Sequence, residues 1–260
     1  MQPKRVYKQK IESLIADEKK RTASSQAKTE YAQQHNTRFK KLVALAKRLE
    51  PNKNAQILDI GRSELTYLLS KKFAHVTSLG FAPEEDEGGH RERSEMNLIK
   101  HITFDLNTSD SIDLWPDGYA GTFDLIMFSE TIEHLHVAPE FVLLFLRYLL
   151  KEEGKIVVTT PNAASIYSRI RLIFGVHPYE KIRYYKQNPG HFREYTVREM
   201  RQIGKTAGLQ VDEMQLVNYK SINYFGSLAN FKYIALKPFE YIPNFRSFMI
   251  AVFKADQQLF

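Results

Sequence analysis

Two carboxylates and a histidine lie close together in the phrase E-T-I-E-H at positions 130–134. In a helical turn, Glu130, Glu133 and His134 would stand at i, i+3 and i+4 and project to one side. Two carboxylates and an imidazole together suit a divalent cation such as Mg²⁺, Mn²⁺, Zn²⁺ or Fe²⁺. His191 is a candidate fourth ligand from a distant segment. We therefore expect a metal site made of these four side chains.

The same residues allow two other interpretations. Without a cation, His134 or His191 would act as a general base, because free imidazole titrates at about pH 6.5. In a purely structural role, Glu133 would bond backbone amides and His134 would be a buried imidazole with its hydrogen bonds satisfied. If the residues do chemistry, we expect Glu130, His134 and His191 to be the catalytic side chains.

Two strands and a helix must position these residues. Positions 125–128 form an unbroken apolar run, which is typical of a strand buried on both faces of a parallel sheet. Pro139 suits the first turn of a helix, Gly154 is expected to end that helix, and positions 155–160 read as a second buried strand. The helix carries apolar residues at helical spacing: Phe141, Val142, Phe145, Leu146 and Leu149. Such a strand–helix–strand unit binds ligands at the carboxyl ends of its strands.

The remaining pattern extends this unit into a larger sheet. Further strands are predicted at 56–61, 75–81, 101–107, 209–218 and 245–254, and helices at 8–49, 64–73 and 196–207. Thr196 and Glu199 stand in capping-box register at the start of the last helix, and Gly208 follows its end. This order predicts an α/β fold with a doubly wound, mostly parallel sheet, N-terminal helices and a terminal strand pair.

Composition limits the function classes. The chain has 260 residues, a net charge of +7 and no cysteine, which excludes disulfides and thiolate metal sites. No apolar run reaches the length of a bilayer span, and the first residues lack the apolar core of a signal peptide, so we expect a cytoplasmic protein. Residues 1–50 hold 13 Lys/Arg against 5 Asp/Glu, and residues 163–205 hold 9 against 3. We interpret the first excess as a solvated helix face and the second as a basic patch near the site.

With the strands placed, the chain resembles class I S-adenosylmethionine (SAM)-dependent methyltransferases of the small-molecule branch. The resemblance runs over about 56–217 and is carried by three phrases in order: F-D-L-I-M-F-S-E-T-I-E-H-L, L-L-K-E-E-G-K-I-V-V-T-T-P-N and H-F-R-E-Y-T. It implies a seven-stranded, Rossmann-like sheet with an antiparallel last strand. It also implies a SAM site across the ends of the first four strands.

The resemblance assigns the first strand and its loop to the cofactor. Asp59 and Gly61 match the first SAM motif, I-L-D-I-G, but the loop continues as Arg62-Ser63-Glu64 without the family's further glycines. Arg62 can pair with the carboxylate of SAM and Glu64 with its ammonium group. Alternatively, Ser63 caps the next helix and Glu64 favours its positive end. The altered loop also leaves open a methyltransferase-like protein that binds without catalysis.

The other cofactor positions follow the next three strands. The family's ribose-binding acid falls at Gly80, and acids at 84–86 are candidate substitutes. Asp105 and the adjoining Leu106 match the adenine-facing end of the third strand. Ser129 matches the end of the fourth strand, beside the methionine part of SAM and the methyl acceptor.

The metal phrase has its own resemblance. E-x-x-E-H, followed later by His-x-x-Glu-aromatic-Thr, is similar to the metal-dependent 2′-O-methyltransferases that act on small-RNA 3′ ends, and related quinone-pathway O-methyltransferases carry the first phrase. The resemblance implies a cation that holds the substrate hydroxyl, lowers its pKa and aligns it with the sulfonium methyl.

Two segments are candidates for acceptor binding. The expected lid at 163–195 interleaves basic and aromatic side chains, which suits an anionic or aromatic acceptor: Tyr167, Arg169, Arg171, Phe174, Tyr179, Arg183, Tyr184, Tyr185 and Asn188. The aromatic insert at 219–244 can line the pocket, dock on a membrane or form a homodimer, but we expect burial within its own domain.

These observations predict an N-terminal helical extension at 1–50 and a methyltransferase domain at 51–260. We expect a SAM-dependent O-methyltransferase for a hydroxyl of a small-molecule, glycan or lipid-linked acceptor, with a divalent cation (Mg, Mn or Zn) as a second cofactor. An RNA 2′-O-methyltransferase is the alternative enzyme. The near-neutral remainder of the chain argues against nucleic acid as a partner.

Overall fold

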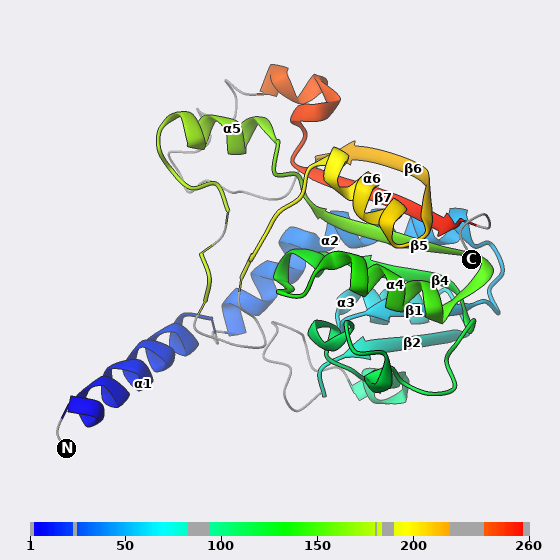
Figure 1. Cartoon of the computed structure of the whole chain (residues 1–260), viewed down its shortest axis with the longest axis horizontal. Helices are drawn as coiled ribbons and strands as arrows, with labels where there is room; N and C mark the ends of the chain where they lie inside the picture. The colour runs from blue at the N-terminus through cyan, green and yellow to red at the C-terminus, as the bar shows by residue number, and fades with distance from the viewer. Residues whose placement is uncertain are drawn as a thin grey trace.

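The computed structural model describes residues 3–22, 25–82, 94–179, 181–183, 190–218 and 237–256 (Figure 1). Its centre is a seven-stranded sheet in the order β3-β2-β1-β4-β5-β7-β6. The strands are β1 (Gln56–Ile60), β2 (His75–Gly80), β3 (Lys100–Thr103), β4 (Phe123–Ser129), β5 (Leu150–Pro161), β6 (Leu209–Val217) and β7 (Phe248–Ala255). Only β7 runs antiparallel to its neighbours, β5 and β6. The predicted doubly wound, mostly parallel α/β sheet is confirmed.

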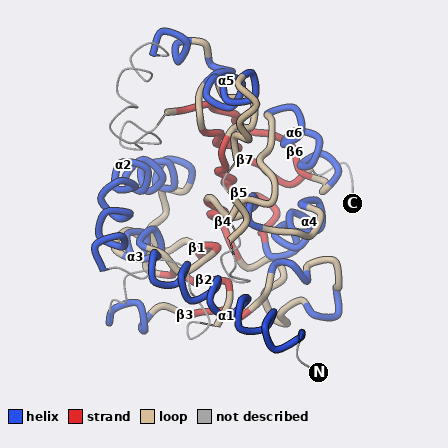
Figure 2. The backbone as a smooth tube through the Cα atoms, turned by 90° about the vertical axis from the view of Figure 1, so that its left-hand side faces the viewer, coloured by secondary structure: helices blue, strands red, loops and turns tan. Residues whose placement is uncertain are grey.

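Helices cover both faces of the sheet, as Figure 2 shows, with α2 and α3 on one side and α4 and α6 on the other. The helices are α1 (Pro3–Thr22), α2 (Ser25–Leu49), α3 (Glu64–Ser70), α4 (Pro139–Leu149), α5 (Ile166–Ile173) and α6 (Val197–Thr206). Short 3₁₀ turns are η1 (Ser94–Leu98), η2 (Leu106–Thr108), η3 (Ile112–Leu114), η4 (Ile132–His134), η5 (Lys237–Tyr241) and η6 (Pro243–Phe245). Within the described residues, every helix is too short or too polar to cross a bilayer.

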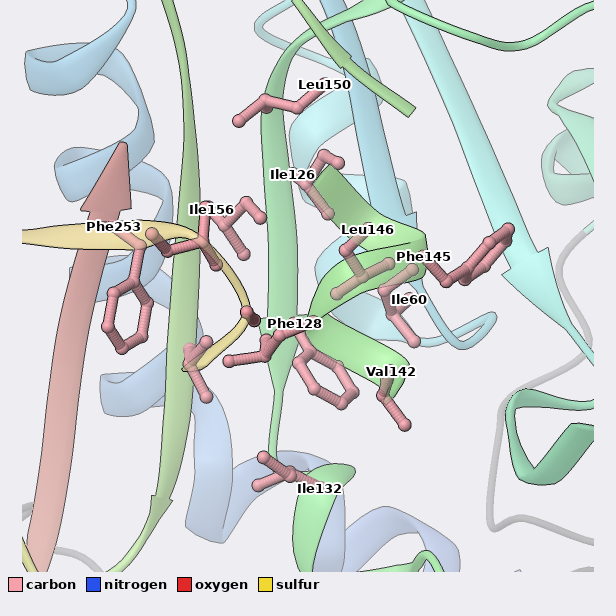
Figure 3. Close-up of a cluster of buried hydrophobic side chains, with 14 of the residues drawn as sticks. Ile60, Ile126, Phe128, Ile132, Val142, Phe145, Leu146, Leu150, Ile156 and Phe253 are labelled. Atoms are coloured by element: carbon pink, nitrogen blue, oxygen red, sulfur yellow. The ribbon is translucent and has the colours of Figure 1, made fainter. Parts of the chain in front are cut away.

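The core on the α4 face follows from the predicted apolar stripe. Val142, Phe145 and Leu146 are buried and lie beside Phe128 of β4 and Ile156 of β5 (Figure 3). Close packing of such side chains makes a core truncation cost about 2–5 kcal/mol. One member of the predicted stripe was wrong, because Phe141 is exposed on the outer side of the helix. This core fixes the carboxyl end of β4, where the candidate chemistry begins.

The opposite face is covered by the second half of α2. Phe39, Leu42 and Ala46 are buried in one cluster with Ile57 of β1 and Leu125 of β4. These α2 side chains recur at three- and four-residue spacing, as expected for a helix that buries one stripe. The end of α2 is therefore part of the sheet's core, while the boundary at residue 50 stays a prediction.

Gly154 does not end α4. The helix stops at Leu149, and Leu150 already has the extended backbone of β5. Gly154 lies within that strand, at an irregularity in its pairing with β4. A Cβ atom there would come within 2.7 Å of Leu150 Cδ1 and 3.0 Å of Phe123 O. The glycine is needed for close packing inside a strand rather than for a helix stop.

The start and end of α6 are as predicted. Glu199 N donates to Thr196 Oγ1 at 3.3 Å, and Thr196 N donates to Glu199 Oε2 at 2.9 Å, which completes the capping box. Gly208, at φ +68°, follows the helix in the left-handed conformation that glycine tolerates. The third strand is shorter than predicted, since it ends at Thr103 and the chain then turns into η2.

Candidate active site

The η4 turn brings together three of the four predicted metal ligands directly after β4. One ligand atom each from Glu133, His134 and His191 lies within 4.8 Å of the others. The two imidazole rings stand edge to face with centroids 4.9 Å apart. Residues 58 positions apart along the chain thus form one cluster, at the end of the sheet where α/β folds bind ligands.

Backbone bonds hold the two halves of this cluster in register. The carbonyl of Glu133 accepts a hydrogen bond from Phe192 N at 2.8 Å. His134 Nδ1 donates to the carbonyl of Gly190 at 2.7 Å, and His191 Nδ1 donates to Glu194 Oε1 at 2.9 Å. Because a carbonyl and a carboxylate only accept, each Nδ1 carries a proton, and in the neutral imidazole the lone pair is then on Nε2. A fixed tautomer of this kind is what second-shell partners give to a metal-binding histidine.

Glu133 is the buried member of the cluster. Its side chain is 1% exposed, and Oε2 accepts a hydrogen bond from Thr160 Oγ1 at 3.0 Å. Oε1 is buried without a hydrogen-bond partner among the described residues. Burial is the main cause that raises the pKa of this carboxyl, and the nearby charge of Glu130 adds to it, while His191 and Thr160 act in the opposite direction. A buried oxygen left without a donor beside two imidazole nitrogens fits a bound cation.

Glu130, the remaining predicted ligand, lies outside this group. It has φ +51°, the only positive φ of a non-glycine residue among those described, and the helical turn begins after it, at Ile132. Its carboxylate accepts a hydrogen bond from Thr159 Oγ1 at 2.8 Å and pairs with Arg38 Nη1 at 3.3 Å. Because Thr159 Oγ1 donates its proton to Glu130, it accepts a hydrogen bond from Ser129 Oγ at 2.9 Å. The side chains at 130 and 133 therefore diverge, because residues 130–134 are not one helical turn.

The first and second strands end side by side, as the cofactor prediction requires. Asp59 is buried, and its Oδ2 accepts a hydrogen bond from Thr66 Oγ1 at 2.6 Å, while Oδ1 has no hydrogen-bond partner among the described residues. Burial raises the pKa of Asp59 to about 7. Gly61, at φ +97°, donates its N–H to Leu79 O at 2.7 Å, and a Cβ on Gly80 would lie 3.7 Å from Gly61 Cα. Glycine at 61 supplies the backbone conformation that the turn needs.

The loop after Gly61 is held by the protein itself. Ser63 caps α3, since its Oγ accepts from Leu65 N at 3.1 Å and its N donates to Thr66 Oγ1 at 2.9 Å. Arg62 Nη2 donates to Asn97 Oδ1 of η1 at 3.0 Å. The capping role of Ser63 is thus observed, and the pairing of Arg62 with a cofactor carboxylate stays a prediction. The acids at 84–86 lie outside the described residues.

Asp105 organises the loop after β3. Its Oδ1 accepts from Asn107 N at 2.9 Å and Asn107 Nδ2 at 3.1 Å, so it caps η2, and Leu106 is buried in the core behind it. Asn107 Oδ1 in turn accepts from His136 N at 2.9 Å. The loops after β3 and β4 are therefore tied together through Asn107, which sequence reasoning missed. Its signal was the D-x-N spacing of an Asx turn.

A family model described as a methyltransferase domain matches residues 31–214. The chain belongs to the methyltransferase-domain family. The match includes the second half of α2, the strands from β1 to β5 and the whole cluster after β4, and it confirms the predicted enzyme class. A comparison with curated proteins gave no match for this methyltransferase.

Solved structures share the fold of this methyltransferase at low identity. A chain of the complex between the Haloferax volcanii Trm112 methyltransferase activator and a methyltransferase has 12% identity and a TM-score of 0.62, covering 90% of this chain and 96% of that one. A geranyl diphosphate methyltransferase in complex with SAM has 12% identity and a TM-score of 0.55, covering 89% and 91%. The Burkholderia thailandensis 1,6-didemethyltoxoflavin-N1-methyltransferase, with bound S-adenosylhomocysteine, has 13% identity and a TM-score of 0.51, covering 84% and 77%. These likenesses show the fold alone.

Arg38 is a second side chain of the candidate site, besides Asn107, that sequence reasoning missed. It comes from α2, is 5% exposed and lies with its guanidinium 5.1 Å from the centre of the Phe39 ring. It sits four residues before Leu42, on the apolar stripe of the helix. An arginine on such a stripe needs a buried partner, which was the available signal.

The predicted acceptor-binding segments are described in part. Tyr167, Arg169 and Arg171 lie on α5, directly beyond the end of β5. Tyr184, Tyr185 and Asn188, and the insert's Tyr219, Tyr224, Phe225, Phe231 and Tyr233, lie outside the described residues. The prediction that the aromatic insert is buried was wrong for two of its described residues, since Phe239 is 44% exposed and Tyr241 is 80% exposed.

Proposed function

We propose that this methyltransferase transfers the methyl group of SAM to a hydroxyl of a small-molecule, glycan or lipid-linked acceptor, with a divalent cation held by Glu133, His134 and His191. The observation that carries the proposal is the convergence of these three side chains after β4. An alcohol or phenol oxygen becomes a better nucleophile when a cation binds it and lowers the pKa of its hydroxyl, whereas amine and carbon acceptors have no hydroxyl to bind.

The donor side of the proposal rests on the edge formed by β1, β2, β3 and β4. Asp59, Gly61, Gly80, Asp105 and Ser129 all stand at carboxyl ends of these strands or in the turns that follow them. Parallel strands expose their ligand-binding loops at this edge. Two of the proteins with the same fold hold SAM or S-adenosylhomocysteine, which supports the same donor here.

The donor set fits a cation by its chemistry. Two imidazole nitrogens and one carboxylate suit Zn²⁺ or Mn²⁺ more than Mg²⁺, which prefers oxygen ligands. When bound, the cation would lower the pKa of the acceptor hydroxyl. The protein's own contribution is orientation: Gly190 and Glu194 fix the two rings, and Thr160 fixes one oxygen of Glu133.

Calorimetric titration tests the binding of the methyl donor and the binding of the cation independently. We expect SAM and S-adenosylhomocysteine to bind the wild-type chain, and Mn²⁺ or Zn²⁺ to bind at a site that His134→Ala and His191→Ala remove. His75→Ala is the matched control, because His75 is exposed at the start of β2, far along the chain from the cluster. Full methyl transfer by the His134 and His191 variants after chelation would refute the cation. Absence of heat with either nucleotide would refute the donor.

A further inference from the structure

Large apolar side chains are exposed together on α5, on the chain that follows it and on η5. Seven of the sixteen exposed large hydrophobic side chains in the described residues belong to this group: Leu172, Ile173, Phe174, Val176, Phe239, Tyr241 and Ile242. We call them the apical surface. Ile173 is 78% and Phe174 77% exposed. Exposed apolar side chains that gather in this way mark an interaction site.

The two parts of the apical surface are joined at their base. Arg169 of α5 lies with its guanidinium 5.4 Å from the centre of the Phe245 ring, and Phe245 lies 6.3 Å from Phe239. Asn162, at the end of β5, donates to the carbonyls of Asn244 and Arg246. Both segments therefore project from the same end of the sheet, as Figures 1 and 2 show.

The surroundings of the apical surface are cationic. Between positions 162 and 183 the sequence has four bases, Arg169, Arg171, Lys181 and Arg183, against the single acid Glu180. Apolar side chains flanked by Lys and Arg are the composition of a segment that lies in the headgroup region of a bilayer. Each such base attracts anionic lipid near the surface.

We infer that the apical surface docks this protein on a membrane that contains anionic lipids. A second copy of the chain fits less well, because a two-fold contact would bring like charges together and the core of a protein interface is depleted of charge. Leu172, Ile173 and Phe174 would enter the acyl boundary, while the positive charge of the flanking bases attracts the lipid phosphates.

The chain that follows the apical surface leads to the candidate metal cluster of Glu133, His134 and His191. A Cβ on Gly190 would collide with the carbonyl of Lys181, so the chain at 181 passes directly against Gly190. The carbonyl of Gly190 holds His134. An acceptor resident in the bilayer would thus meet the cluster from the docked side. That consequence rests on the proposed function, whereas docking itself requires neither donor nor cation.

Flotation of the full chain with lipid vesicles tests the inference. We expect binding to vesicles of phosphatidylcholine mixed with phosphatidylglycerol, weaker binding to phosphatidylcholine alone, and a decrease with added salt. The double variant I173S/F174S should lower the partition coefficient about tenfold or more, because two large apolar side chains are lost. Lys181→Gln should lower it less, by about threefold to fivefold.

The matched control is I112S/L114S, which removes two side chains of similar exposure from η3, away from the apical surface. It should bind vesicles like the wild type, and both double variants should bind SAM unchanged. Equal binding by I173S/F174S and wild type would overturn the inference. So would absence of binding to both vesicle types, or a dimer in sedimentation that I173S/F174S abolishes. A failure of SAM binding with intact flotation would count against the proposed function alone.

Discussion

Glu130 and Glu133 are three residues apart, yet their carboxylates have opposite surroundings. The negative charge of Glu130 is balanced, because its carboxylate pairs with the guanidinium of Arg38 and accepts a hydrogen bond from the hydroxyl of Thr159. Glu133 is more deeply buried. One of its carboxylate oxygens accepts a hydrogen bond from the hydroxyl of Thr160, and the other has no hydrogen-bond partner among the described residues. Adjacent threonines of β5 point to opposite faces of the strand, so each serves a different carboxylate. The difference suggests that Glu130 organises the site and that Glu133 is its chemical group.

The largest expected effect comes from the uncompensated carboxylate. Glu133→Ala should lower methyl transfer about 100-fold or more, because the cluster loses its anionic ligand. Glu152→Ala, an exposed carboxylate in β5, is the control and should leave turnover unchanged. The measurement is transfer of labelled methyl from SAM. Near-normal turnover of Glu133→Ala would reverse the assignment of the two roles.

Removal of Arg38 tests the compensated carboxylate. Arg38→Ala leaves Glu130 without its counter-charge at a site where both side chains are largely buried, and should lower the free energy of unfolding by about 3 kcal/mol. Urea denaturation measures this. In a double-mutant cycle, adding Glu130→Gln should recover part of the loss, since the two residues are coupled. Additive losses would show that the ion pair carries no energy of its own.

Gly190 connects the cluster to the chain at 181. Gly190→Ala requires an alanine at φ +82° with its Cβ against the carbonyl of Lys181, and should cost about 2 kcal/mol of stability. It should also weaken cation binding, because His134 loses the position of its carbonyl partner. Gly175→Ala also changes a glycine of positive φ, but a Cβ there meets open space, so it is the control. Equal effects of the two variants would contradict a role for Gly190 beyond its φ.

The smallest effects are expected for Thr159→Val and Thr160→Val, which should differ in cation affinity but not in stability. Thr159→Val and Thr160→Val should each lower stability by about 1 kcal/mol, the net contribution of one hydrogen bond. Only Thr160→Val should also weaken cation affinity, because Thr160 orients Glu133. Calorimetry with Mn²⁺ or Zn²⁺ distinguishes them. Equal cation affinity in both variants would indicate that Glu133 needs no support from β5.

The sequence predicted the elements whose signals are local. The apolar runs of β4 and β5 and the capping box of α6 each act within a few residues, so they were readable without a structure. The different orientation of the Glu130 side chain could not be predicted, because its partners Arg38 and Thr159 lie far away in the sequence. The prediction for Gly154 was wrong for a related reason. A glycine can follow the end of a helix, but it can also lie in a strand where there is no room for a Cβ atom. The contact with Leu150, which only the structure shows, distinguishes the two.

Candidate site residues divide in the same way. The E-x-x-E-H phrase and the H-F-R-E-Y-T phrase identified Glu133, His134 and His191, whose meeting follows from their places at one end of the sheet. Arg38 was missed because its partner, Glu130, lies in the turn after β4, and an apolar stripe on a helix does not say what covers it. The exposure of Phe239 and Tyr241 was also hidden, since aromatic composition alone is equally typical of a core.

The pairing of Arg38 with Glu130 also bears on the order in which the chain can assemble. Arg38 leaves the ribosome well before Glu130, and Thr159 follows later still. A nascent chain that has produced α2 therefore holds an arginine on an apolar stripe before its partner Glu130 exists. The counter-charge of Arg38 is made only with Glu130, and the hydroxyl that supports Glu130 only with Thr159, so the complete pair requires residues from the C-terminal half of the protein.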